Sequence, residues 1–138
     1  MLPCDEAVPS LGMGSWVRGE KPAHRADELA TLRLGLDLGC RLIDTAQMYG
    51  EGLAETLVGD ALAGRRDEAF SATKVYPHHA SLAGTAAACD RGLRRLGTGR
   101  IDPYHLHLRG QVALAETMRA FEALQSGRKD PPLRRQRP

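Results

Sequence analysis

The sequence predicts an α/β fold with a parallel sheet. From residue 8 onward, short apolar runs alternate with longer amphipathic runs, which is the pattern of strands followed by helices. The expected strands end near Met13, Asp44, Lys74 and His107, at spacings of 31, 30 and 33 residues. Alternating strands and helices imply parallel strands with right-handed crossovers. The near-constant spacing favours equivalent units, so we expect a (β/α)8 barrel of the TIM type, with about four βα units present.

The expected strands are the short apolar runs of this pattern. They cover Pro9 to Met13, Arg41 to Thr45, Ala69 to Lys74 and Ile101 to Leu108. A doubly wound sheet needs a glycine-rich first turn, but residues 12–17, GMGSWV, lack the third glycine of GxGxxG. A Rossmann turn is therefore a weak interpretation of this segment.

Four helices are expected in the gaps between and after the strands. Residues 25–39 and 52–64 each carry an apolar face and end at a glycine, as a carboxy-terminal cap would require. Residues 81–97 begin with a Ser81 cap and end at Gly97, and residues 113–127 form the last helix. The residues expected on the apolar faces are Ala26, Leu29, Leu32, Leu36, Leu53, Leu57, Val58, Leu62, Leu114, Met118, Phe121 and Leu124.

Composition predicts one globular domain without a membrane span. The chain has 138 residues, 42% of them apolar, and no apolar run approaches the roughly 18 residues that a span requires. The amino terminus lacks a signal-peptide pattern, so we expect a cytoplasmic protein. Cys4, Cys40 and Cys89 are odd in number and far from any CxxC spacing, which predicts reduced thiols.

The net charge of +2 is unevenly distributed. Residues 127–138 carry five basic side chains against one acidic, whereas the other 126 residues carry 14 basic and 16 acidic side chains. The body of the protein is therefore not a nucleic-acid surface. We expect a domain over residues 1–126 and an irregular Arg/Pro-rich tail over residues 127–138, because the tail has neither strand pattern nor core residues.

Four polar side chains are expected at one mouth of the barrel. The carboxyl ends of parallel strands meet there, which would bring Asp44, Lys74 and His107 together, with Tyr49 in the loop after the second strand. A phenol is a poor acid at neutral pH, but a lysine ammonium beside it stabilises the phenolate, and an aspartate fixes the ammonium. This combination indicates a general acid.

Each of these residues also has a structural interpretation. Asp44 could be a turn cap, Tyr49 a loop anchor, Lys74 a solvated edge charge and His107 a core histidine. Their shared position at strand ends favours the acid–base site over four separate structural roles. The adjacent pair at 78–79 is not expected to bind metal, because neighbouring side chains point apart and no third ligand has suitable spacing.

Four segments resemble the aldo-keto reductase family in order and spacing. They are GMGSW at 12–16, RLIDTAQMYGEGLAETLVGDAL at 41–62, TKVYP at 73–77 and RLGTGRIDPYHLHLRG at 95–110. The resemblance implies an NADP-dependent oxidoreductase that reduces a small aldehyde or ketone with NADPH, without a metal, nucleic-acid or membrane partner.

The resemblance also implies roles for individual residues. Tyr49 would protonate the carbonyl oxygen as NADPH delivers hydride to its carbon. Lys74, held by Asp44, would tune the phenol, and His107 would orient the carbonyl. The first loop, Gly14, Ser15 and Trp16, would contact the cofactor together with Asp44, and the substrate would contact Trp16, Tyr49 and His107.

The sequence departs from the family pattern at two places. The family has Leu-Leu-His on its fourth strand, but residues 104–107 read Tyr-His-Leu-His. Both histidines face one side, and His107, at the carboxyl end, is assigned the role, with His105 lower in the barrel. After residue 126 the family continues through a fifth strand, whereas this chain reads RKDPPLRRQRP from residue 128.

The second departure predicts the amino-terminal half of such a barrel. We then expect the chain alone to have very weak activity and to self-associate through the exposed edges of the half barrel. Two alternatives remain open at this point. One is an inactive truncated fragment of such an enzyme, and the other is a non-catalytic binding subunit related to the family.

Overall fold

The computed structural model describes residues 7–127, which form a parallel sheet of four strands with helices between them. The strands are β1 (Gly12–Gly14), β2 (Leu42–Asp44), β3 (Phe70–Val75) and β4 (Tyr104–Leu106). The helices are α1 (Arg25–Asp37), α2 (Leu53–Ala61), α3 (Leu82–Leu96) and α4 (Leu114–Gly127). Short 3₁₀ segments are η1 (Pro22–His24), η2 (Tyr49–Gly52), η3 (Arg66–Glu68) and η4 (Pro77–His79).

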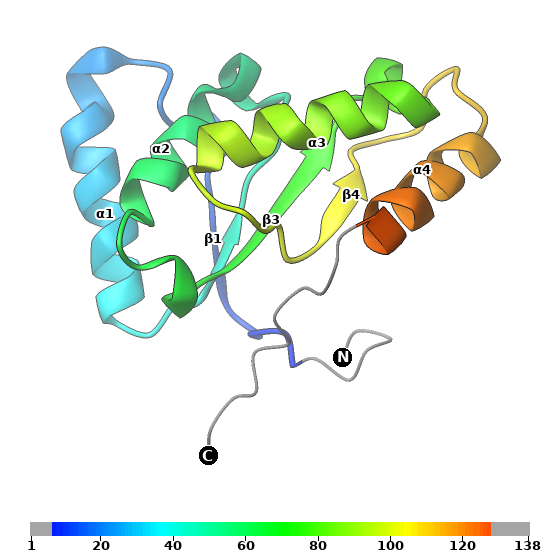
Figure 1. Cartoon of the computed structure of the whole chain (residues 1–138). Coiled ribbons are helices and arrows are strands. Elements are labelled where there is room, and N and C mark those ends of the chain that lie inside the picture. Colours follow the sequence, from blue (N-terminus) through cyan, green and yellow to red (C-terminus); the bar gives the residue numbers. More distant parts are fainter. Residues whose placement is uncertain (1–6, 128–138) are drawn as a thin grey trace.

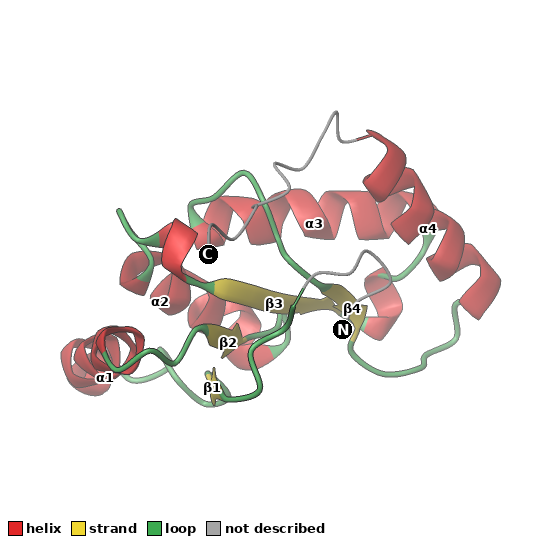
Figure 2. Ribbon diagram, turned by 90° about the horizontal axis from the view of Figure 1, so that it is seen from below, coloured by secondary structure: helices red, strands yellow, loops and turns green. Residues whose placement is uncertain are grey.

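The strand order is β1-β2-β3-β4, and each neighbouring pair is parallel. Figure 1 shows the helices lying across one face of this sheet, and the view from below in Figure 2 shows the strands side by side with the helices along one side of them. Sequential order with every crossover on one face is the arrangement of a barrel wall rather than of a doubly wound sheet. The predicted order and direction of the strands are confirmed.

The sheet has one face toward the helices and one face away from them. Met13 and Ile43 are register partners whose side chains join the core formed with α1, α2 and α3. Because side chains alternate along a strand, the partners Gly14, Asp44 and Ala72 lie on the opposite face, which is the inner face of a barrel. The core lies between the sheet and the helices, and its buried members include Leu32, Leu36, Ile43, Leu57, Val58, Leu96 and Ile101.

The ends of α3 follow the predicted capping pattern. The Ser81 hydroxyl oxygen accepts a hydrogen bond from the Gly84 N–H at 3.1 Å, which satisfies one of the free donors of the first turn. Gly97 ends the helix in the left-handed conformation, with φ of 60°. The helix between them is the longest in the part of the chain that the structure describes.

Several expected boundaries and faces were wrong. β1, β2 and β4 are shorter than predicted, and β3 continues to Val75. Ala26 and Leu53 are exposed on their helices, as are Leu114 and Met118. On α4 the predicted Phe121 and Leu124 pack against the core, and Thr117 and Ala120 also turn inward, with the Thr117 hydroxyl donating a hydrogen bond to the Ala80 carbonyl at 2.8 Å.

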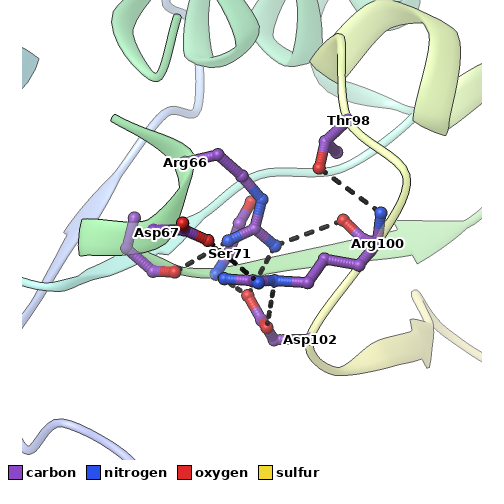
Figure 3. A network of polar contacts seen from close by, with 7 residues as sticks. Arg66, Asp67, Ser71, Thr98, Arg100 and Asp102 are labelled. Atoms are coloured by element: carbon purple, nitrogen blue, oxygen red, sulfur yellow. Dashed lines mark hydrogen bonds and ion pairs between the residues drawn. The ribbon is translucent and has the colours of Figure 1, made fainter. Parts of the chain in front are cut away.

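A polar network joins the amino-terminal ends of β3 and β4 (Figure 3). Asp102 accepts hydrogen bonds from the Ser71 N–H at 2.6 Å and from Arg66 at 2.7 Å. The Arg100 guanidinium lies 3.6 Å from the other Asp102 oxygen and donates to Asp67 at 3.1 Å. These contacts hold the end of the sheet opposite the predicted site.

Some predictions fall at the edges of the described residues. Cys40 and Cys89 are free thiols, while Cys4 lies outside the described residues. Gly127 is the last residue of α4, and residues 128–138, where the irregular tail is predicted, also lie outside them. Among the helices of residues 7–127, none is long and apolar enough to cross a membrane.

Candidate active site

The carboxyl ends of β2, β3 and β4 bring the predicted polar residues together. Asp44 is the last residue of β2 and pairs with Ala72 of β3, two residues before Lys74. Lys74 in turn pairs with His105 of β4, and His107 follows two residues later. Neighbouring strands are about 4.8 Å apart, so these side chains share one edge and one face of the sheet. Register alone therefore accounts for their convergence.

Lys74 and Asp44 form an ion pair within hydrogen-bonding distance. The Lys74 Nζ donates to Asp44 Oδ1 at 2.7 Å and to Oδ2 at 2.8 Å, which confirms the predicted salt bridge. Nζ also donates to the Thr45 carbonyl at 2.8 Å, and the Lys74 side chain is largely buried. These three contacts match the three donors of an ammonium group. The charge of Lys74 is therefore held at a fixed point.

Tyr49 lies beside both Lys74 and His107. The Lys74 Nζ sits over the Tyr49 ring, 5.1 Å from its centroid, and the Tyr49 and His107 rings meet edge to face with centroids 5.5 Å apart. An ammonium at this distance from an aromatic ring is attracted by the π electrons of the ring. Because the donors of Lys74 go to Asp44 and Thr45, the influence of Lys74 on Tyr49 is electrostatic.

The loop that carries Tyr49 is attached to the end of β3. The Thr45 N–H donates to the Ala72 carbonyl at 2.9 Å, and the Gln47 N–H donates to the Lys74 carbonyl at 3.1 Å. The Tyr49 N–H then donates to the Ala46 carbonyl at 3.1 Å, which closes a turn. Backbone hydrogen bonds thus continue the β2–β3 ladder past the last strand residue and fix the start of the loop.

Both histidines at this edge are held in the neutral form. Desolvation lowers the pKa of His107, and the positive charge of Lys74 lowers it further, against the opposing effect of Asp44. The pKa of His105 is also lowered, by desolvation first and by Lys74 second, again against the opposing effect of Asp44. The His107 N–H of the backbone donates to the Val75 carbonyl at 3.1 Å. At neutral pH each imidazole therefore has one N–H donor.

The first loop is anchored to Asp44 through Ser15. The Ser15 hydroxyl and backbone N–H both donate to the Asp44 carbonyl, each at 3.0 Å, and Ser15 is fully buried. Trp16, next in the chain, exposes 70% of its surface. The loop therefore holds a large aromatic ring, available for contact, next to the strand that ends in Asp44. Gly14 pairs with Asp44 in the sheet.

Sequence reasoning missed the residues that surround this site. The Thr45 carbonyl is a backbone group, which no side-chain pattern reveals. Gln47, Glu51 and Tyr76 form hydrogen bonds around the Tyr49 loop. All three lie inside the segments that carry the resemblance, so the polar residues of those segments were the available signal. Among residues 7–127, no cluster of three or more His, Cys, Asp or Glu side chains could hold a metal ion.

Comparison with known proteins gives a consistent result. The model of the Aldo/keto reductase family matches residues 10–128. The methylglyoxal reductase YeaE of Escherichia coli is 46% identical over 120 residues, which are 87% of this chain and 42% of that protein.

Solved structures give the same picture. An aldo/keto reductase from Klebsiella pneumoniae, in complex with NADP and acetate, is 48% identical, with a TM-score of 0.85 over 88% of this chain and 43% of that one. The holo form of the aldo-keto reductase AKR11C1 from Bacillus halodurans is 34% identical, with a TM-score of 0.79 over 89% and 44%. The chain thus spans less than half the length of these relatives.

Proposed function

Because this chain belongs to the aldo/keto reductase family, we propose that it carries the acid–base site of an NADPH-dependent reductase of aldehydes or ketones. The single observation that carries the proposal is the contact set of Lys74, whose ammonium is bound to Asp44 and lies over the Tyr49 ring. The relative named methylglyoxal reductase suggests a small reactive aldehyde as substrate.

Tyr49 is the proposed proton donor. Its hydroxyl gives its proton to the carbonyl oxygen as negative charge develops there, and the Lys74 ammonium stabilises the phenolate that remains. Asp44 acts on Tyr49 indirectly, because it keeps the Lys74 ammonium in place. A general acid positioned in this way contributes about 10²- to 10⁴-fold to a reaction rate.

His107 is proposed to orient the carbonyl group. Its ring lies edge to face with that of Tyr49, so a carbonyl oxygen near the phenol is also near the imidazole. The lowered pKa of His107 keeps the ring neutral, with one N–H available for a hydrogen bond to that oxygen. Its Nδ1 is buried and has no hydrogen-bond partner among the described residues. His105 is the register partner of Lys74 and lies two residues before His107 along the chain.

The residues present fit a nicotinamide cofactor. When bound, NADPH supplies the hydride that reduces the carbonyl carbon. The exposed ring of Trp16, anchored next to Asp44 through Ser15, offers a flat apolar surface for an aromatic ring to contact. We propose that Gly14, Ser15, Trp16 and Asp44 line this side of the cofactor site and that Trp16 also contacts the substrate.

The experiment completes the barrel and then removes the proton donor. Residues 1–127 are joined to the carboxy-terminal part of YeaE that this chain does not match, and NADPH oxidation is followed with methylglyoxal. We expect turnover that falls about 10²-fold or more in Tyr49→Phe. Tyr104→Phe is the matched control, because Tyr104 packs toward the helices.

Two outcomes would contradict the proposal. A folded chimera that binds NADPH and keeps its rate in Tyr49→Phe would remove Tyr49 from the chemistry. A folded chimera that binds NADPH but never oxidises it with any carbonyl compound would instead favour the non-catalytic binding subunit. The chain of 138 residues, assayed alongside, tests the expectation of very weak activity for the half barrel.

A further inference from the structure

The residues directly after Tyr49 adopt an unusual backbone conformation. Gly50 has φ of 57° and Glu51 has φ of 53°, and Gly52 follows with φ of 93°. Glycine adopts this left-handed region freely, but a residue with a side chain pays about 1–2 kcal/mol. Such a conformation persists where surrounding contacts hold it. Glu51 therefore requires a contact that fixes it.

That contact is a hydrogen bond across to the loop after β3. The Tyr76 hydroxyl donates to Glu51 Oε1. Tyr76 itself is held at its backbone, because its N–H donates to Gln47 Oε1 at 3.2 Å. Gln47 is buried, and its amide lies 3.1 Å from His79 Nδ1. The Tyr76 ring also contacts the rings of His78 and His79, with centroids 4.7 and 5.7 Å away.

These contacts surround Tyr49 on both sides along the chain. Gln47 precedes Tyr49 by two residues and Glu51 follows it by two, and both are bonded to Tyr76. Tyr76 in turn follows Lys74 by two residues on the neighbouring strand and loop. One residue thus ties both ends of the Tyr49 segment to the chain that carries Lys74.

We propose that Tyr76 and Glu51 are positioning residues that hold the Tyr49 ring against Lys74 and His107. The catalytic consequence of this inference rests on the proposed function, but the position of the Tyr49 ring can be measured separately. On its own segment Tyr49 is held through its backbone, whose N–H donates to the Ala46 carbonyl and whose carbonyl accepts from the Leu53 N–H. Without the Tyr76–Glu51 bond, the strained residue after Tyr49 relaxes and the ring loses its fixed distance from the ammonium.

The ionisation of Tyr76 agrees with this arrangement. The hydrogen bond to Glu51 raises the pKa of Tyr76, and desolvation and the charge of Glu51 raise it further. The phenol therefore stays protonated, and remains a donor, throughout the neutral range. A phenol that donates to a carboxylate forms a charge-assisted bond, which is stronger than a neutral one.

The test uses the purified chain of 138 residues and three variants. Tyr76→Phe removes the donor, Glu51→Ala removes the acceptor while the backbone strain remains, and Glu51→Gln keeps an acceptor oxygen as the matched control. The chain has three tyrosines, so tyrosine-labelled samples give few ring resonances, which Tyr→Phe variants assign. The readout is the NMR cross-relaxation between the Tyr49 and His107 rings, which are 5.5 Å apart.

We expect loss of the Tyr49–His107 cross peak in Tyr76→Phe and in Glu51→Ala, and its retention in Glu51→Gln. The dispersed amide spectrum should persist in all variants, which separates loss of position from loss of fold. An unchanged cross peak in Glu51→Ala would overturn the proposal, even if Tyr76→Phe failed to fold. Since the readout requires no turnover, absence of carbonyl reduction by the completed barrel would contradict the proposed function and leave this result intact.

Discussion

Removal of the Asp102 carboxylate should destabilise the fold far from the candidate site. Its side chain is only 11% exposed and accepts hydrogen bonds from the Ser71 N–H and from Arg66 (Figure 3). In Asp102→Ala, the buried Ser71 N–H and a largely buried guanidinium lose their acceptor together. Breaking a buried ion pair costs about 3–5 kcal/mol. Because Arg66 retains the carbonyls of Ala69 and Arg100 as acceptors, we expect the lower end, about 3 kcal/mol.

Two further variants divide this loss into its parts. Asp102→Asn keeps an oxygen for the Ser71 N–H and removes the charge, so it should cost less, about 1–2 kcal/mol. Asp67→Asn is the matched control, because Asp67 is 71% exposed and its pair with Arg100 should contribute below about 1 kcal/mol. Urea unfolding followed by circular dichroism gives the free energy of unfolding of each variant. If Asp102→Ala lowered the free energy of unfolding by no more than Asp67→Asn does, the reasoning would be refuted.

Three other substitutions test the packing, the capping and the ionisation of the fold. Gly59→Ala should cost about 1–3 kcal/mol in urea unfolding, because its Cβ would lie 2.4 Å from the Arg95 carbonyl oxygen; a neutral result would contradict the close α2–α3 approach. Ser81→Ala should lower the unfolding free energy by about 1 kcal/mol, and Ser81→Asp should restore it. Desolvation, helped by His78 and Arg91 for His79 and by Lys74 for His107, lowers the pKa of both histidines. Below about pH 6.5 the unfolded chain therefore binds more protons, and stability should fall as the pH drops through the folded values. The pKa of His105 is lowered as well, so the triple variant His79→Gln/His105→Gln/His107→Gln should flatten that dependence, and an unchanged slope would contradict it.

The sequence was sufficient to predict how strands and polar groups meet. Asp44 and Lys74 lie at the ends of consecutive strands with nearly equal spacing, so the parallel register brought them together as expected. The inward face of α4 was predicted only in part, at Phe121 and Leu124. Leu114 and Met118 are exposed, whereas Thr117 is buried, because a hydrogen bond to the Ala80 carbonyl decides the orientation. Hydrophobic periodicity carries no information about such a bond.

Buried charge was the second feature that pattern could not reveal. Glu55 of α2 is 1% exposed and accepts hydrogen bonds from the Thr73 hydroxyl at 2.6 Å and from Arg95 at 3.0 Å. A glutamate in a helix predicts a solvated face unless its partners are known, and these partners are 18 and 40 residues away. The same reason hid the Tyr76–Glu51 bond, whose residues lie 25 positions apart.

In the proposed function, Tyr49 provides the proton. The Lys74 ammonium, which Asp44 keeps in place, stabilises the phenolate that remains. The most direct measurement compares NADPH affinity with the single-turnover rate of methylglyoxal reduction in the completed barrel and in its Tyr49→Phe variant. We predict a cofactor dissociation constant within about twofold of the parent and a rate lowered by about 10²- to 10⁴-fold. A rate within about threefold of the parent at saturating NADPH, or a loss confined to cofactor affinity, would contradict the claim.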